Sequence, residues 1–209
     1  REVLEGAMDG IERSSALTDL GLERGKYVLV SAHREENIDL EGNFLSLMNA
    51  INRIAETYQV PVIYSTHPRS QKFITQRSFQ FHPLVRNVKP LGFFDYNCLQ
   101  MNSLLVLSDS GTLSEESAML DFCGVLIRTS TERPEVLDKG TVVIGGITTQ
   151  SISQAVELAI AMREAKEPRA MPADYADGNV SVKVVKIIQS YTPIVNQTVW
   201  LKSSSISAS

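Results

Sequence analysis

The segment 104–118 constrains this chain most, because in it a buried strand turns directly into a helix. Residues 104–107 are four consecutive aliphatic side chains, which is the composition of a strand covered on both faces. The polar turn 108–111 (Ser-Asp-Ser-Gly) follows, and Leu113 and Leu120 after it fit one face of a helix. Strands buried on both faces belong to parallel sheets with helices on each side, so this segment predicts an α/β fold.

The rest of the chain repeats the alternation of strand and helix. We expect strands at 26–32, 61–65, 87–90, 104–107, 124–127 and 141–144. We expect helices at 1–20 in two pieces broken near Gly10, and at 39–58, 70–76, 94–101, 113–122, 151–165 and 180–191. Strands joined by helical crossovers form parallel sheets, so the sequence predicts a doubly wound, Rossmann-like sheet of about six strands.

Composition excludes several classes of protein. The net charge of −4 argues against a nucleic-acid-binding protein, which needs a basic face to meet phosphates. Apolar runs stay well short of the roughly 20 residues of a membrane span. Cys98 and Cys123 have no metal-ligand spacing and lie in apolar surroundings, so we expect free buried thiols and a cytoplasmic, reducing compartment.

The organisation of the chain predicts one domain that is part of a longer protein. The sequence begins at Arg1, within what reads as a helix, so we expect a piece of a longer protein. Residues 1–201 are expected to form a single nucleotide-binding domain, and the Ser-rich residues 202–209 a disordered tail.

The helix that follows residue 111 is a candidate anion site. The first N–H groups of a helix have no partner within it, and the helix dipole adds positive potential there. Gly111 permits close approach of a phosphate, Ser110 adds a hydroxyl donor, and Glu116 can accept hydrogen bonds from a sugar. Ordinary helix capping also explains these residues, and from the Ser-Gly turn alone it is the stronger interpretation. A G-x-G-x-x-G pattern is missing after the first strand, so standard dinucleotide binding is not expected.

Polar residues follow four of the expected strands. They are His33 and Arg34, His67 and Arg69, residues 108–112, and residues 128–133. The carboxyl ends of parallel strands share one edge, where ligands of such sheets bind, so we expect these residues to converge there with net positive charge.

Each of these residues also has a plain structural interpretation. His33 and His67 could only shape their loops, and Arg133 could pair with Glu132 or Glu135. Tyr96 could stack on a base, although packing of its own short helix is the stronger interpretation. Glu35 and Glu36 are read as a solvated loop.

Three motifs, in this order and spacing, resemble a known family. They are 31–37 (Ser-Ala-His-Arg-Glu-Glu-Asn), 108–116 (Ser-Asp-Ser-Gly followed by Glu115-Glu116) and 131–135 (Thr-Glu-Arg-Pro-Glu). Together they resemble the non-hydrolysing UDP-N-acetylglucosamine 2-epimerases, over residues 1–188. The first motif and residues 191–200 look closest to a sub-group that forms UDP-N-acetyl-L-fucosamine.

The resemblance implies a fold and a set of partners. The fold would be the C-terminal, UDP-binding domain of a two-domain glycosyltransferase-B arrangement, with the N-terminal domain of the same chain as its partner. A homodimer is expected, without cofactor, metal, nucleic acid or membrane. His67 matches a residue near a second, regulatory nucleotide site in some members.

The resemblance also implies a role for each site residue. His33 would be the catalytic residue near the diphosphate, and Ser110, Gly111 and Thr112 would bind phosphate. Glu116 would bind the ribose, Arg133 the nucleotide sugar, and Tyr96 would lie near the uracil. Thr112 replaces a more usual glycine, and Leu91 replaces a polar side chain, so uracil would be bound there by main-chain groups.

The implied chemistry is anti elimination of UDP across C1–C2 of the sugar and re-addition to give the C2 epimer. The acids for proton transfer would lie in the N-terminal domain, so this chain alone should bind UDP without epimerising. A hydrolysing epimerase or a glycosyltransferase of the same architecture, and a non-catalytic nucleotide-sugar-binding module, remain alternatives.

Overall fold

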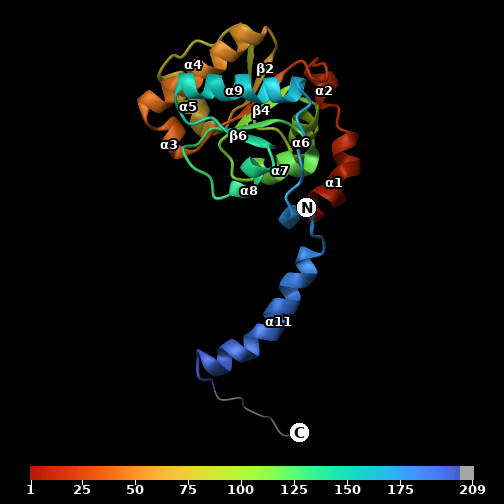
Figure 1. The fold of residues 1–209 in the computed structure, drawn as a ribbon. Helices are drawn as coiled ribbons and strands as arrows, with labels where there is room; N and C mark the ends of the chain where they lie inside the picture. The colour runs from red at the N-terminus through yellow and green to blue at the C-terminus, as the bar shows by residue number, and fades with distance from the viewer. Residues whose placement is uncertain (203–209) are drawn as a thin grey trace.

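The computed structural model describes residues 1–202, and its centre is a six-stranded, wholly parallel sheet (Figure 1). The strands are β1 (Val28–Ser31), β2 (Val62–Ser65), β3 (Val85–Val88), β4 (Leu105–Ser108), β5 (Gly124–Leu126) and β6 (Val142–Ile144). Their order across the sheet is β3-β2-β1-β4-β5-β6. This is the doubly wound Rossmann order, so the predicted fold class is confirmed.

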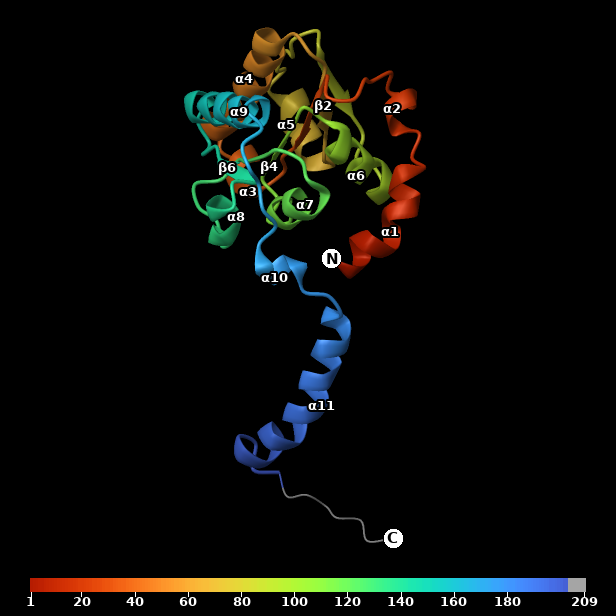
Figure 2. The same cartoon turned by 45° about the vertical axis from the view of Figure 1, so that its right-hand side comes forward.

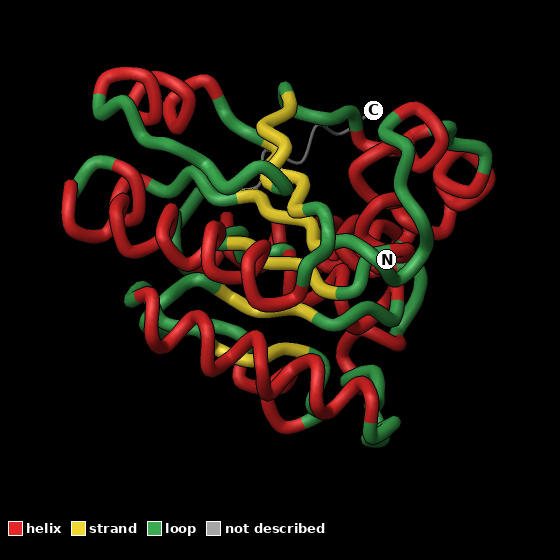
Figure 3. The backbone as a smooth tube through the Cα atoms, turned by 90° about the horizontal axis from the view of Figure 1, so that it is seen from above, coloured by secondary structure: helices red, strands yellow, loops and turns green. Residues whose placement is uncertain are grey.

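Helices cover both faces of the sheet (Figure 3). One layer holds α3 (Glu35–Ile38), α4 (Glu41–Tyr58), α5 (Pro68–Gln76) and α9 (Thr149–Glu164). The other holds α1 (Glu2–Glu12), α2 (Ala16–Asp19), α6 (Phe93–Asn102), α7 (Leu113–Leu120) and α8 (Pro134–Asp138), with the short α10 (Ala173–Ala176) beside it. The polar tail predicted for 202–209 falls almost entirely outside the described residues.

The central strands supply both cores, because successive side chains of a strand point to opposite faces. In β4, Leu105 and Leu107 pack with α4 and α9, whereas Val106 packs with α1 and α6. All three side chains are fully buried. The aliphatic run that predicted a doubly covered strand is therefore explained by burial on both sides.

Several predicted boundaries differ from the structure; the third strand, for example, was expected at 87–90 and spans Val85–Val88. The first helix continues through Gly10, where a break was expected, and ends at Glu12. Gly10 lets α1 lie close against α6, since a Cβ at this position would come within 2.6 Å of the Phe94 ring. Residues Glu35–Ile38 form the helix α3 where a loop was expected. The last helix, α11 (Val180–Thr198), passes through Pro193 and ends seven residues beyond the predicted Tyr191.

Helix α11 leaves the body of the domain and points away from it in both side views (Figures 1 and 2). Among the described residues it buries none of its own side chains. Most of its apolar residues, among them Val184, Ile188 and Tyr191, are about half exposed. No helix within residues 1–202 is long and apolar enough to cross a bilayer.

Candidate functional site

The candidate site lies where the order of the strands reverses, at the carboxyl ends of β1 and β4. The two strands are neighbours, and Ser31 pairs with Ser108 at their last positions. The chain turns from β1 toward one layer of helices and from β4 toward the other, which opens a crevice at such switch points. The loop after β1 carries His33 and the turn after β4 carries Ser110, so the fold brings together two of the predicted groups.

The turn that begins α7 presents hydroxyls and amides at this edge. Ser110 Oγ lies 3.0 Å from Thr112 Oγ1 and accepts a long hydrogen bond, 3.4 Å, from the Thr112 amide. The first α-helical bond runs from the Glu116 amide to the Thr112 carbonyl, at 2.9 Å. Thr112 is the N-cap of α7 and no side chain among the described residues caps the helix, so the capping interpretation is not supported, and the Ser110 hydroxyl stays at the exposed edge.

Gly111 is not required by the fold. Among the described residues, no atom lies within 4 Å of the place that a Cβ would take, and its φ is not in the left-handed region. Glycine at this position therefore leaves open space in front of the start of α7.

His33 is held at the site by the residue after β4. Its amide donates to Asp109 Oδ2 at 2.8 Å, while about 46% of its side chain is exposed. The His67 ring lies beside it, with 5.4 Å between ring centroids. His67 Nδ1 accepts a hydrogen bond from the Arg69 amide at 3.2 Å and so caps α5, as the loop-shaping interpretation predicted.

Arg133 reaches the first turn of α7 from the loop after β5. Its Nε donates to Glu115 Oε1 at 2.6 Å, so its partner is neither of the two acids predicted from the sequence. The guanidinium remains 43% exposed and keeps further N–H groups for a ligand. The carboxylate fixes the direction from which Arg133 approaches this edge.

The edge is less positive than the sequence predicted. The other three arginines there are also paired: Arg34 with Glu36, Arg69 with Asp39 and Glu35, and Arg128 with Glu132. The expectation of a net positive surface counted the arginines and overlooked acids brought to them by α3 and by the loop after β5. Amides and hydroxyls at the start of α7 are therefore the principal donors left for an anion.

Glu116 and Tyr96 lie on the inner side of the site. Glu116 Oε2 accepts a hydrogen bond from Gln100 Nε2 at 2.7 Å, and burial raises the pKa of its carboxyl. Burial, followed by the nearby charge of Glu116, also raises the pKa of the Tyr96 phenol. The Tyr96 ring is half-buried against the apolar layer of α1 and α6, which agrees with the packing interpretation.

A protein-family model described as UDP-N-acetylglucosamine 2-epimerase matches residues 2–189 of this chain. The chain belongs to that family.

Named relatives and solved structures agree with this family. UDP-N-acetylglucosamine 2-epimerase of Methanococcus maripaludis is 30% identical over 167 residues, which cover 78% of this chain and 44% of the relative. A putative UDP-N-acetylglucosamine 2-epimerase of Thermotoga maritima is 31% identical over 182 residues, 82% of this chain and 46% of the relative.

Among solved structures, UDP-N-acetylglucosamine 2-epimerase from Rickettsia bellii aligns with a TM-score of 0.82 and 32% identity, over 96% of this chain and 54% of that one. The Methanocaldococcus jannaschii enzyme in complex with UDP-GlcNAc and UDP aligns with a TM-score of 0.75 and 25% identity, over 86% and 50%. This epimerase-family chain spans about half the length of the relatives it matches.

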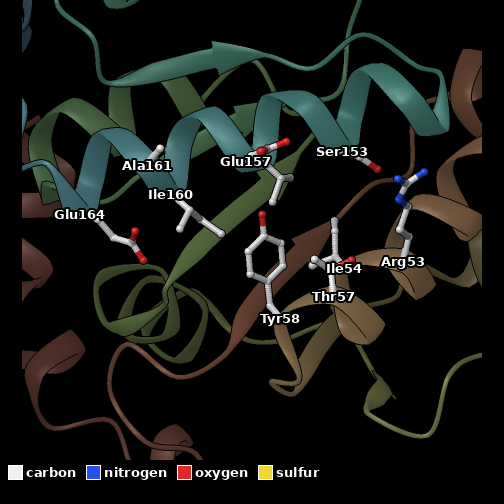
Figure 4. A pocket seen from close by; sticks show the side chains of 10 residues that line it. Arg53, Ile54, Thr57, Tyr58, Ser153, Glu157, Ile160, Ala161 and Glu164 are labelled. Carbon is white, nitrogen blue, oxygen red and sulfur yellow. The ribbon is translucent and has the colours of Figure 1, made fainter.

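The grooves on this epimerase-family domain lie away from the switch point. A groove of about 440 Å³ runs between α4 and α9, with Tyr58, Arg53 and Glu157 on its walls (Figure 4). A second, of about 770 Å³, lies between α5 and the edge strand β3. Of the described residues that line these two grooves, none is a predicted site residue.

Two residues of the site were not singled out by the sequence reasoning. Asp109 is completely buried at the end of β4, and Asn37 is 1% exposed beneath the loop after β1. Both occur in the family motifs, but nothing in their spacing indicated that they contact each other. A carboxylate placed directly after a doubly buried strand was the available signal, since a buried charge needs partners. Within residues 1–202, no group of side chains is arranged to hold a metal ion.

Proposed function

We propose that this chain is the UDP-binding half of a UDP-N-acetylhexosamine 2-epimerase, which inverts C2 of the sugar for cell-surface polysaccharide synthesis. The observation that supports this proposal is the meeting of three elements at one edge. Asp109, next to Ser110, accepts from the His33 amide at 2.8 Å, and Arg133 contacts the first turn of α7 at 2.6 Å. The proposal places the diphosphate among these groups.

The diphosphate is the leaving group in the proposed reaction, anti elimination of UDP followed by its re-addition. Negative charge grows on it as the C1–O bond breaks. Amides at the start of α7, the hydroxyls of Ser110 and Thr112, and the Arg133 guanidinium stabilise that charge because they are fixed before it develops. His33 is the proposed catalytic residue on this half, facing the diphosphate from β1.

The nucleoside is assigned to the inner side of the same edge. Glu116 accepts hydrogen bonds from the ribose hydroxyls, and burial of its carboxyl makes such donors favourable partners. Tyr96 borders the uracil, and main-chain groups near Leu91 contact the base. The sugar is N-acetylglucosamine or a 2-acetamido-2,6-dideoxy-hexose.

Removal of the C2 proton needs a general base. In our proposal that base belongs to an N-terminal domain, which closes over this edge in a glycosyltransferase-B arrangement. The span of the chain, about half that of its relatives, is consistent with such a second domain. We also propose a cytoplasmic homodimer.

The test compares binding with turnover. UDP titrated calorimetrically into the 209-residue chain should bind, while deuterium from the solvent should not enter C2 of UDP-N-acetylglucosamine. Supplying the acid-bearing domain should start that exchange and give a UDP-linked epimer. Free sugar as the product would instead identify a hydrolysing enzyme, and exchange by this chain alone would refute the half-site proposal.

Substitutions at the site give a second test. Ser110→Ala should weaken UDP binding roughly two- to tenfold, the effect of one neutral hydrogen bond. Arg133→Ala should weaken it roughly ten- to a hundredfold, because a charge-assisted bond is lost. Arg13→Ala is the control, since its ion pair with Asp9 is exposed and lies at the end of α1. Unchanged UDP affinity in both site variants would show that the assignment is wrong.

A further inference from the structure

Asp109 is a fully buried carboxylate at the switch point, directly after β4. An ionised side chain in such a place needs strong partners, because burial removes its hydration. Its two oxygens differ sharply in what they contact.

Oxygen Oδ2 ties the loop after β1 to β4. It accepts hydrogen bonds from the amides of His33 and Arg34, both at 2.8 Å, and from Asn37 Nδ2 at 3.1 Å. Asn37 Nδ2 also lies 3.2 Å from the carbonyl of Ile127, just beyond β5. One carboxylate oxygen thus fixes the backbone on which His33 is carried.

Oxygen Oδ1 has no hydrogen-bond partner among the described residues, although it is buried. His33 Nδ1 lies 3.7 Å from it. That distance exceeds a hydrogen bond, so a bond between these atoms requires the imidazole ring to turn toward Oδ1. The His67 ring lies 5.4 Å from the His33 ring between centroids, and it already uses its own Nδ1 to cap α5.

We propose that Asp109 is a positioning residue that sets the tautomer of His33. Oδ1 accepts a hydrogen bond from Nδ1–H, so the proton of the neutral ring resides on Nδ1 and Nε2 is the atom turned toward the ligand. The nitrogen that carries the proton of a histidine is set by the hydrogen bond made at the other nitrogen. The inference concerns His33 itself. It rests on the proposed function only for the identity of the ligand at Nε2.

Asp109→Asn separates this role from a merely structural one. The amide oxygen can take the place of Oδ2 and keep the bonds to the His33 and Arg34 amides. The amide nitrogen then takes the place of Oδ1 and offers a donor to Nδ1, which must become the acceptor. The proton of the neutral ring should therefore move to Nε2.

The experiment determines which ring nitrogen of His33 carries the proton. It uses long-range proton–nitrogen NMR spectra of the labelled chain, at a pH where the ring is neutral. We expect the Nδ1–H form in the original chain and the Nε2–H form in Asp109→Asn. Backbone signals of residues 33 and 34 should show that the loop is retained. Asp121→Asn is the matched control, because Asp121 is an exposed carboxylate paired with Arg169; it should leave His33 unchanged.

An Nε2–H form in the original chain, or the same tautomer in both proteins, would overturn the inference. If Asp109→Asn does not fold, the original chain still decides, since Nδ1–H supports the proposal and Nε2–H contradicts it. UDP is then added to both proteins. Loss of affinity in Asp109→Asn is expected, whereas a chain that binds no UDP at all would count against the proposed function and leave the tautomer result standing.

Discussion

At Gly111 the fold leaves open space where a side chain would begin, and this makes the residue the sharpest probe of the site. A methyl group there meets no described atom within 4 Å and no backbone strain. Glycine also costs more conformational entropy on folding than alanine does. Only a ligand that lies close to the backbone would require a residue without a methyl group at this position.

We therefore predict that Gly111→Ala keeps or slightly raises the free energy of unfolding and weakens UDP binding at least about tenfold, the equivalent of roughly 1.4 kcal/mol. Denaturant unfolding and calorimetry measure the two effects. Gly6→Ala is the matched control, because Gly6 on α1 has equally open surroundings. An unaltered affinity for UDP in Gly111→Ala would place the phosphates elsewhere.

Glu116 links the pH of the solution to the stability of the domain. Burial raises the pKa of its carboxyl, so the folded chain binds this proton more tightly than the unfolded chain does. Its contribution to stability is then complete below the ordinary pKa of a glutamate, and it is lost as the pH rises through the higher pKa of the folded state.

Glu116→Gln removes the cost of burying an ionised carboxylate at neutral pH, and its amide oxygen can still accept a hydrogen bond from Gln100. We predict that the variant is more stable than the original chain at neutral pH, with the difference vanishing in acid below that window. Melting temperatures measured across pH test this, with Glu5→Gln, on the exposed face of α1, as the control. A variant that is less stable at neutral pH would contradict the assigned direction.

Helix α11 shows how an element can be predicted correctly while its environment is not. The spacing of Val184, Ile187 and Ile188 predicts a helix with an apolar face, and the helix exists. An apolar face usually implies packing, yet these side chains are exposed on a helix that leaves the domain. Local pattern specifies the helix, and only the tertiary structure shows what covers it.

Deleting α11 should therefore cost the domain little. We predict that a chain ending at Gly178 melts within about 2–4 °C of the original, the shift expected for 1 kcal/mol in a domain of this size. The deletion removes an exposed ion pair between Lys183 and Asp177 and one hydrogen bond to Glu2, and exposed pairs of this kind stabilise a fold only weakly. Thermal unfolding measures this.

A substitution on α9 serves as the comparison for that deletion. Ile152→Ala removes a fully buried side chain and should cost roughly 2–5 kcal/mol. If removing α11 destabilised the domain as much as Ile152→Ala does, α11 would have a structural role within the domain that its exposure does not indicate.

At the scale of the whole molecule, the sequence predicts the sheet far better than the electrostatics of its edge. Aliphatic runs such as 104–107 specify buried strands, and the alternation with helices specifies parallel pairing, so the predicted convergence of His33 with the turn after β4 follows. The partners of Arg133 and Arg69 could not be predicted, because Glu115 and Asp39 are brought to them by folding. The contacts of Asp109 with the loop after β1 could not be predicted for the same reason.

The central claim is that the amides starting α7 hold a diphosphate, with His33 and Arg133 beside them. Its most direct test is an amide NMR titration of the labelled 209-residue chain with UDP. We predict the largest shift changes at Gly111, Thr112 and Ser114, accompanied by changes at His33 and Arg133. Changes gathered instead on the α4–α9 groove, around Tyr58 and Glu157, with the start of α7 undisturbed, would contradict the account.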